Sequence, residues 1–284
     1  QMLKFRDLVE TELERREFDW GIIHSHERCL SHHVTTFHGP SIFDRKFSLI
    51  SRLASMRIRA WEMMERREVS YASVQAVVVV SDLVSSTLRR FHPEISEKKV
   101  FRACPGVNPS VPCLSVSDQQ TNGDVRYVFV GKEWKRKGLD VAVRVVDRLA
   151  QMTGWNVYLD VYGPEPSAVP YIIQRNPRVR LCGWRRDIPY SSYMALIHPA
   201  RKEPFGMIIS EARALGLPVL ASDQTGAQCF EFSGARFLSL RLNADIWSYE
   251  LRKITIDEHN RDPEVIWTWD DLVALHVSDI YPTI

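Results

Sequence analysis

The chain has 284 residues and a mass of 32.9 kDa, which is room for about two domains of ordinary size. Hydrophobic residues make up 45% and charged residues 25%, a composition that predicts a folded core and excludes disordered, collagen-like and coiled-coil proteins. The apolar runs, such as residues 76–80, are far shorter than the roughly 20 residues that a transmembrane helix needs. A formal net charge of +2 gives no support to nucleic acid as a partner.

The cysteine usage predicts a cytoplasmic location. The five cysteines are odd in number, widely spaced and form no C-x-x-C pair, a pattern typical of reduced thiols. No signal-peptide pattern follows Gln1, and because Gln1 is not a methionine we expect further residues before it.

Short β-branched runs in residues 1–108 predict a first, less complete Rossmann-like domain. They lie at residues 20–24, 34–37 and 76–80, with helical or loop stretches between them. Residues 109–124 carry two prolines, several Ser and Gln residues and an Asn-Gly pair, which predicts an exposed linker and a domain boundary.

A helix with two distinct faces is predicted between Phe43 and Glu68. One face carries the apolar residues Phe43, Phe47, Ile50, Ala54, Ile58 and Trp61. The opposite face carries arginines every seven residues: Arg45, Arg52, Arg59 and Arg66. The pattern has two interpretations. The first is a solvated face, partly balanced by nearby glutamates, and the second is docking to anionic lipid head groups or a phosphorylated glycolipid acceptor at the inner-membrane surface.

The second half of the chain alternates strands and helices more regularly. Apolar runs predict strands at residues 125–130, 155–162, 179–182, 194–198 and 218–221. Helical patterns at 137–152 and through 211–215 lie between them, which predicts right-handed crossovers and a parallel sheet in a domain over residues 125–245. Apolar stripes in residues 246–284 predict a helical tail that packs back on the first domain.

The strongest chemical signal is the run Glu203-Pro-Phe-Gly-Met-Ile-Ile-Ser-Glu211. Its proline and glycine predict a loop whose backbone N–H groups lie at the positive end of a helix, a favourable place for a diphosphate. Glu203 lies at the mouth of this loop and Glu211 about one to two helical turns further on, so the two carboxylates can bind hydroxyl groups of a sugar nucleotide. A helix-stabilising Glu203 and a solvated Glu211 explain the spacing equally well.

A second constellation is the basic loop Gly131-Lys132-Glu133-Trp134-Lys135-Arg136-Lys137-Gly138. It follows a predicted parallel strand, at the sheet edge where open α/β folds bind ligands, and its four cations predict a phosphate partner. The glycine spacing fits neither a P-loop nor G-x-G-x-x-G, which disfavours an ATPase and an NAD-dependent dehydrogenase. A solvated basic run is the alternative. Because cations at a helix amino end are disfavoured, we expect an anion to compensate them.

These motifs form a set: V-G-x(6)-G in the basic loop, Tyr162-Gly-Pro, His198-Pro199, E-P-F-G-x(4)-E and Gly216-Leu-Pro-Val-Leu. With them, residues 125–237 resemble the donor-binding domain of the family-four retaining glycosyltransferases of GT-B fold, which implies an α/β protein with two Rossmann-like parallel-sheet domains facing a cleft. The resemblance implies that Arg136 and Lys137 hold a nucleotide diphosphate, that Glu203 touches the transferred sugar and that Glu211 binds the ribose. It also implies a donor site that includes Gly131, Lys132, Phe205, Gly206, Met207 and Ile208.

The amino-terminal half resembles the same family more loosely. The run Thr35-Thr-Phe-His-Gly-Pro40 looks like the loop whose histidine contacts the donor sugar across the cleft, which makes His38 a catalytic candidate. A complete GT-B acceptor domain would place a first strand and a glycine-rich loop before the segments seen here, so we expect this domain to be incomplete. Ala227, Gln228 and Cys229 replace the family's second glycine and following glutamate. A finer resemblance to bacterial transferases of the lipopolysaccharide core rests on residues 24–28, 37–40 and 61–68.

The histidines at positions 24, 26, 32, 33 and 38 invite a zinc interpretation, which their spacing disfavours because alternate strand residues point to opposite faces. The run Tyr158-Leu-Asp160-Val-Tyr162 is not an Asp-x-Asp nucleotide-metal motif. We therefore expect no metal and no cofactor, with protein cations and a helix end stabilising the charge of the leaving group.

The sequence thus predicts a glycosyltransferase that takes a hexose, glucose as first guess, from a nucleotide diphosphate sugar, UDP as first guess. The expected partners are this donor, a glycan or glycolipid acceptor and an anionic membrane surface. Two alternatives remain open: a sugar-nucleotide epimerase of the same fold and a non-catalytic relative that binds sugar nucleotides.

Overall fold

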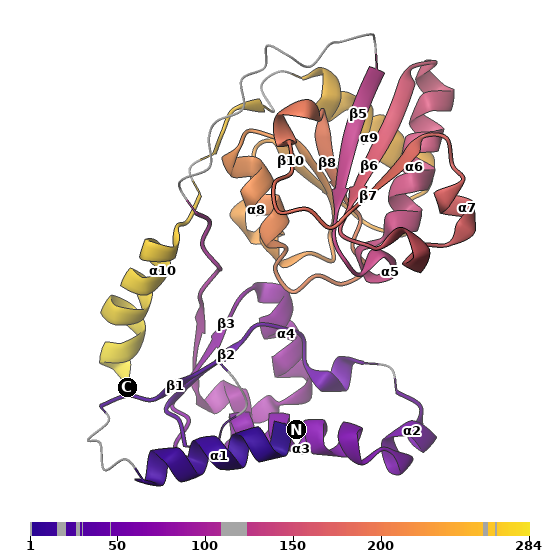
Figure 1. Cartoon of the computed structure of the whole chain (residues 1–284). Coiled ribbons are helices and arrows are strands. Elements are labelled where there is room, and N and C mark those ends of the chain that lie inside the picture. The colour runs from indigo at the N-terminus through magenta and orange to yellow at the C-terminus, as the bar shows by residue number, and fades with distance from the viewer. Residues whose placement is uncertain are drawn as a thin grey trace. The chain divides into compact units, whose positions relative to one another are not determined.

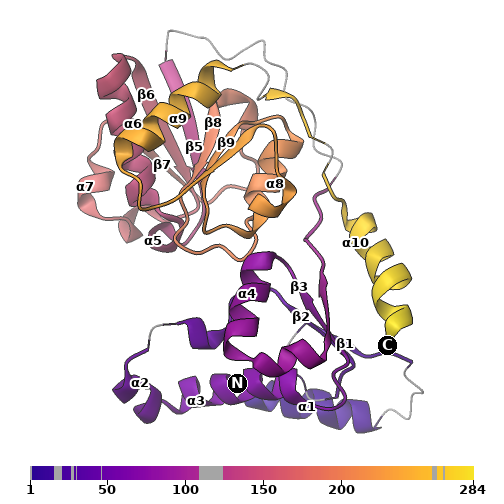
Figure 2. The ribbon, with the colours of Figure 1, turned by 180° about the vertical axis from the view of Figure 1, so that it is seen from behind.

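The computed structural model describes residues 2–15, 21–26, 29, 31–45, 47–108, 124–257, 261–264 and 266–284. These divide into two compact units, each with its own parallel sheet (Figures 1 and 2). The first unit comprises residues 1–106 and 269–284, and the second comprises residues 107–268. Residues 109–123, which hold nearly all of the predicted linker, lie outside the described residues.

The first unit is built on a four-stranded sheet in the order β1-β2-β3-β4. Its strands are β1 (His24–Ser25), β2 (Val34–Phe37), β3 (Ala76–Val79) and β4 (Lys99–Arg102). Its helices are α1 (Met2–Arg15), α2 (Leu49–Ala54), α3 (Met56–Ser70), α4 (Asp82–Phe91) and α10 (Trp269–Leu275), with short turns η1 (Ile42–Asp44), η2 (Pro93–Glu97), η8 (His276–Ile280) and η9 (Tyr281–Thr283). Every residue of β2 and β3 is buried, as expected for the β-branched runs that predicted them.

The carboxyl-terminal segment completes the core of the first unit. Ile280 is fully buried against a cluster that includes Val34 and Val78, and Leu272 and Leu275 of α10 pack against the same cluster. The tail predicted over residues 246–284 is divided between the units, because its first helix, α9 (Ala244–Ile256), buries Trp247, Leu251 and Ile254 in the second unit. Figure 2 shows α9 lying beside α6 on the sheet of that unit.

The second unit is a doubly wound sheet in the order β10-β9-β8-β5-β6-β7, with all strands parallel. Its strands are β5 (Asp124–Val130), β6 (Asn156–Tyr162), β7 (Val179–Gly183), β8 (Ala195–His198), β9 (Val219–Ser222) and β10 (Ala235–Leu238). Its other helices are α5 (Trp134–Lys137), α6 (Leu139–Thr153), α7 (Tyr171–Gln174) and α8 (Met207–Ala214), with short turns η4 (Pro166–Ala168), η5 (Tyr190–Ser192) and η6 (Gly226–Phe230). The five strands predicted in this half are confirmed.

The single helix predicted between Phe43 and Glu68 is wrong. The segment forms η1, α2 and α3, because Ser48 and Ser55 cap new helices: their hydroxyls accept hydrogen bonds from the amides of Ser51 and Ile58. The predicted apolar face is also broken, since Ile50 is 79% exposed. Among the described helices, none is both long and apolar enough to cross a membrane.

The helix predicted at 137–152 is confirmed as α6, which begins at Leu139 and follows the one-turn helix α5. Gly138 separates α5 from α6 and adopts φ +78°, a left-handed conformation that favours glycine. The cations Lys135, Arg136 and Lys137 therefore lie in the single turn of α5, directly before the amino end of α6. The Glu203 carboxylate supplies an anion that compensates two of them, because it contacts both Arg136 and Lys137.

Candidate active site

The topology of the second unit places two loops side by side. The chain runs from β5 to β6 and β7 on one side of the sheet and returns to β8, β9 and β10 on the other, so the direction of winding reverses between β5 and β8. Open α/β sheets bind ligands at the carboxyl ends of the strands at such a reversal. The basic loop follows β5 and the Glu203 loop follows β8, which brings the two sequence motifs to this one position.

Gly138 lets these two loops approach each other. A Cβ at this position would lie 2.0 Å from the backbone carbonyl oxygen of Pro199, which follows β8. The amide of Arg201 donates a hydrogen bond of 2.8 Å to the carbonyl of Arg136, which joins the loops further. The second glycine of V-G-x(6)-G is therefore required by backbone packing.

The Glu203 carboxylate is the centre of the site. One of its oxygens, Oε2, lies 2.9 Å from Lys137 Nζ and 3.1 Å from Arg136 Nη1. His198 Nε2 is 3.5 Å from the same oxygen. The predicted diphosphate cations and the predicted sugar-binding carboxylate are thus brought together, as an ion-paired cluster within one unit.

Burial and charge act in opposite directions on this cluster. Burial favours the neutral form of Glu203, but the His198 imidazole and the Lys137 ammonium outweigh it and lower the pKa of the carboxyl to about 2. For Arg136, burial is outweighed by contacts with Glu133 and Glu203, and the pKa of the guanidinium is raised. Glu203 is therefore a carboxylate at neutral pH, paired with Lys137 and with Arg136, which also pairs with Glu133.

Backbone contacts hold Glu203 in place. Its amide donates to the carbonyl of Gln224 at 2.9 Å, and its carbonyl accepts from the amide of Gly226 at 3.0 Å. Arg136 is held from the other side by Glu133, at 2.8 Å, and by the carbonyl of Lys202, at 2.7 Å. The cluster is therefore prepared by the two loops before any ligand binds.

The amino end of α8 begins beside Glu203. Gly206 caps the helix with φ +96°, and a Cβ there would lie 2.8 Å from Thr225 Cγ2. Phe205 is buried against Phe230, which fixes the loop, while Met207 is 38% exposed. The first-turn amides of an α-helix have no partner within the helix, so this end of α8 can bind an anion.

Glu211 lies further along α8 and is half-buried. Burial raises the pKa of its carboxyl, and the charge of Lys137 opposes this rise. Burial and the charge of Glu211 together raise the pKa of the Tyr190 phenol, which indicates that Tyr190 lies nearby. Of the remaining predicted donor residues, Gly131 is half-buried and donates its amide to the carbonyl of Tyr162, while Lys132 is exposed.

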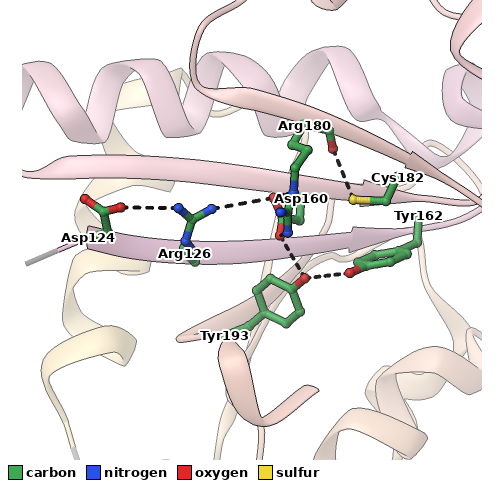
Figure 3. A network of polar contacts seen from close by, with 7 residues as sticks. All are labelled: Asp124, Arg126, Asp160, Tyr162, Arg180, Cys182 and Tyr193. Atoms are coloured by element: carbon green, nitrogen blue, oxygen red, sulfur yellow. Dashed lines mark hydrogen bonds and ion pairs between the residues drawn. The ribbon is translucent and has the colours of Figure 1, made fainter. Parts of the chain in front are cut away.

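A polar network centred on the buried Asp160 links neighbouring strands (Figure 3). Arg180 of β7 binds Asp160 of β6 through two nitrogens, and Tyr193 donates its hydroxyl to the same carboxylate at 2.9 Å. Tyr193 also hydrogen-bonds to Tyr162 at 2.8 Å, at the carboxyl end of β6. Asp160, which is 1% exposed, therefore acts as an anchor for β6, β7 and the segment before β8.

His38 lies in the first unit, at the end of a row of stacked imidazoles. Its Nε2 is 2.9 Å from Nδ1 of His26, and the rings stack with centroids 5.2 Å apart. His26 stacks on His24 at 4.5 Å, and His24 stacks on His276 at 5.3 Å. Burial and the neighbouring histidines lower the pKa of His24 to about 4, so this ring is neutral at pH 7.

This histidine row does not form a metal site among the described residues, where no group of three or more metal-ligating side chains is suitably placed. His24 has other partners instead. Its Nδ1 is 2.9 Å from the hydroxyl of Tyr281 and its Nε2 is 2.7 Å from that of Thr36. The row thus joins the carboxyl-terminal segment to the loop that carries His38.

The four arginines predicted to line one helix face lie on separate elements. Arg45 follows η1, Arg52 lies in α2, and Arg59 and Arg66 lie in α3. Arg52 pairs with Glu62 at 3.2 Å, and the guanidinium of Arg66 lies over the ring of Phe43. The predicted single column is wrong, because the capping serines redirect the chain.

The fold is GT-B, with two parallel-sheet α/β units, and the charged cluster of Glu203, Arg136 and Lys137 lies at the reversal of the second sheet. Residues 124–238, the part of the chain that holds the cluster, match the family described as glycosyl transferases group 1. This match lies within the second unit.

Solved structures share this fold. A sucrose-phosphate synthase from Thermosynechococcus elongatus is 18% identical with a TM-score of 0.72, covering 99% of this chain and 77% of its own. WaaG, a glycosyltransferase involved in lipopolysaccharide biosynthesis, is 19% identical with a TM-score of 0.68, covering 96% and 78%.

One curated relative, the protein adenylyltransferase VbhT from Bartonella schoenbuchensis, is 23% identical over 95 residues. The match covers 34% of this chain and 17% of that protein, so the chain spans well under two thirds of it.

Sequence reasoning gave no role to several residues at or near the site. His198 was part of a motif, but the motif does not show that its ring faces Glu203. Tyr190 and Tyr193 lie in or beside η5, a short turn without periodicity. Tyr193 belongs to the set of residues that resembles the family, whereas Tyr190 gives no sequence signal that separates it from an ordinary surface residue.

Proposed function

We propose that this protein is a retaining glycosyltransferase that moves a hexose from a nucleotide diphosphate sugar to a glycan or glycolipid acceptor. The observation that carries the proposal is the cluster of Glu203, Arg136 and Lys137 beside the amino end of α8. Glucose and UDP are the first candidates for sugar and nucleotide. A lipopolysaccharide-core acceptor is the first candidate for the second substrate.

The cluster supplies what cleavage of a glycosyl phosphate bond requires. Negative charge develops on the diphosphate as the bond to the sugar lengthens, and Arg136 and Lys137 are fixed positive groups that stabilise it. The first amides of α8 add aligned dipoles. Glu203 remains ionised and can accept hydrogen bonds from sugar hydroxyls, and Glu211 can accept them from the ribose.

The test is incubation of the full chain with a panel of nucleotide diphosphate sugars and lipopolysaccharide-core acceptors of different lengths. We expect one sugar to be transferred with its anomeric configuration kept, and we expect EDTA to leave the rate unchanged because protein cations stabilise the leaving group. Loss of turnover in EDTA with rescue by Mn²⁺ would contradict the metal-free mechanism. The role of His38 as a contact of the transferred sugar stays a prediction, tested by His38→Ala.

Two other functions are separated by the same panel. A sugar-nucleotide epimerase would convert the donor without any acceptor, and a non-catalytic relative would bind the donor without turnover. Product analysis with and without acceptor decides between the three.

We further propose that α2 and the start of α3 dock on an anionic membrane surface, at a peripheral and cytoplasmic location. Four apolar side chains there are 75–79% exposed: Leu49, Ile50, Leu53 and Met56. Arginines lie on the same and neighbouring elements: Arg45 after η1, Arg52 in α2, and Arg57 and Arg59 in α3. Exposed apolar side chains on elements that also carry arginines match the acyl boundary and the head groups of an anionic membrane.

The docking proposal is tested by sedimentation with vesicles of neutral or acidic lipid. Each cation near the surface contributes about 1 kcal/mol, so we expect retention on acidic vesicles at low salt and release at high salt. Leu49→Ser with Leu53→Ser should weaken retention, while Leu8→Ser, at the 70% exposed Leu8 of α1, serves as the control. Retention that ignores lipid charge would contradict the proposal.

A further inference from the structure

His198 is a fully buried histidine without a hydrogen-bond partner. Its relative exposure is 0%, and neither of its ring nitrogens makes a hydrogen bond within the described parts of the chain. Buried polar groups are normally paired, because an unpaired one loses its hydration without compensation. The orientation of this ring therefore calls for an explanation.

The ring points one nitrogen at the centre of the candidate active site. Nε2 is 3.5 Å from Glu203 Oε2, the oxygen that Lys137 and Arg136 also contact. A carboxylate only accepts hydrogen bonds, so a neutral His198 interacts favourably with it only when Nε2 carries the proton. Burial and the charges of Lys137 and Arg136 favour the neutral ring and lower its pKa, although Glu203 opposes this effect.

Donor binding changes the balance around Glu203. In the proposed function, Arg136 and Lys137 bind the diphosphate. The phosphates and the Glu203 carboxylate then compete for the same two cations. Arg136 keeps further partners in Glu133 and the carbonyl of Lys202, whereas Lys137 has a long flexible side chain that can turn toward a phosphate. His198 is fixed by burial and stays in place.

We propose that His198 is a positioning residue for Glu203: its Nε2–H holds the carboxylate in place as the donor's phosphates draw Lys137 and Arg136 away. When the cations leave, Nε2–H and the carboxylate close to hydrogen-bond distance, and the carboxylate keeps its direction toward the sugar. This inference rests on the proposed function for its role in turnover, but the arrangement of His198 and Glu203 can be tested without any sugar nucleotide.

The first test measures the tautomer of His198 in the full chain by ¹H–¹⁵N correlation of histidine rings, with His198→Gln to assign the signal. We expect the Nε2–H tautomer in the free protein, and we expect Nε2–H to remain protonated at saturation with inorganic pyrophosphate. The Nδ1–H tautomer in either state would overturn the proposal. If pyrophosphate does not bind, the donor site in the proposed function is refuted. The tautomer measured in the free protein still tests whether His198 pairs with Glu203.

The second test separates positioning from folding by kinetics with the nucleotide sugar that supports turnover. His198→Leu removes the donor group, and we expect kcat to fall about tenfold or more, as for loss of a hydrogen bond to a charged group, while KM for the donor changes little. His198→Gln keeps an N–H near the Nε2 position and should recover most of the rate.

Ile197→Val, one residue earlier on β8 and also fully buried, is the matched control for loss of packing and should keep kcat. An unchanged kcat in His198→Leu, or a Gln variant as slow as the Leu variant, would overturn the proposal. Absence of turnover in the unmodified protein with every donor would instead overturn the proposed function.

Discussion

The close approach at Gly138 gives a prediction whose size follows from the geometry. Gly138 and Gly154 both adopt left-handed backbone, with φ +78° and +70°. An alanine at Gly154 would meet no atom within 4 Å, whereas an alanine Cβ at Gly138 would lie 2.0 Å from the carbonyl oxygen of Pro199. Both substitutions therefore strain the left-handed backbone, but only Gly138→Ala also causes a steric clash.

For Gly154→Ala we expect a loss of unfolding free energy of about 1–2 kcal/mol, from the left-handed conformation alone. For Gly138→Ala the clash with Pro199 adds an overpacking cost of about 1–3 kcal/mol, which gives roughly 2–5 kcal/mol in total. The contacted atom is the backbone carbonyl oxygen of Pro199, which cannot rotate away as the end of a flexible side chain can. The basic loop must therefore shift to relieve part of the clash. We therefore also expect weaker binding of inorganic pyrophosphate.

Urea unfolding of both variants measures the loss, and hydrogen exchange at the amides of β5 and β8 assigns it to the second unit. A Gly138→Ala variant that loses no more stability than Gly154→Ala would refute the reasoning. It would show that the two loops can move apart at little free-energy cost and that close packing does not require a glycine at position 138.

Three further predictions concern the cluster. Arg136→Ala with Lys137→Ala should weaken binding of nucleoside diphosphates but not of the nucleoside, measured by calorimetry, because only phosphate charge is lost; equal losses would indicate misfolding. Glu211→Ala should cost about 1.5–3 kcal/mol of nucleotide binding, and unchanged affinity would contradict its ribose role. The Glu203 pKa of about 2 lies below its ordinary 4.5, so its stabilisation is present above pH 4.5 and is lost toward pH 2. Between pH 4.5 and pH 2, the unfolding free energy of Glu203→Gln, measured with urea, should therefore fall by roughly 3 kcal/mol less than that of the unmodified protein. An equal fall in both proteins would contradict the pKa shift.

The sequence by itself determined the second unit almost completely. Runs such as 125–130 and 155–162 are apolar and β-branched and end at glycine, and a buried parallel strand needs little else to be recognised. The loops after β5 and β8 were found from their cations and carboxylates. Because the carboxyl ends of parallel strands share one edge, chain order alone placed both loops at that edge.

Short edge strands escaped prediction. The strands β4 and β10 have four residues each and carry arginines, as in Arg102 and Arg236, so their sequences show no clear apolar run. Each pairs with only one neighbour, β3 or β9, and it is this pairing that makes them strands. The residues of β4 and β10 do not by themselves indicate which strand they will pair with.

The tertiary structure alone decided which charges and faces meet. The heptad spacing of arginines around Ser48 and Ser55 predicted one helix, because periodicity does not register that a serine hydroxyl can cap a new helix. The contacts of Glu203 with Lys137 and His198 join residues that are 66 and 5 positions apart, respectively. Their distances depend on how closely two loops pack, and that packing is set by Gly138 against Pro199, a contact between backbones that no side-chain pattern records.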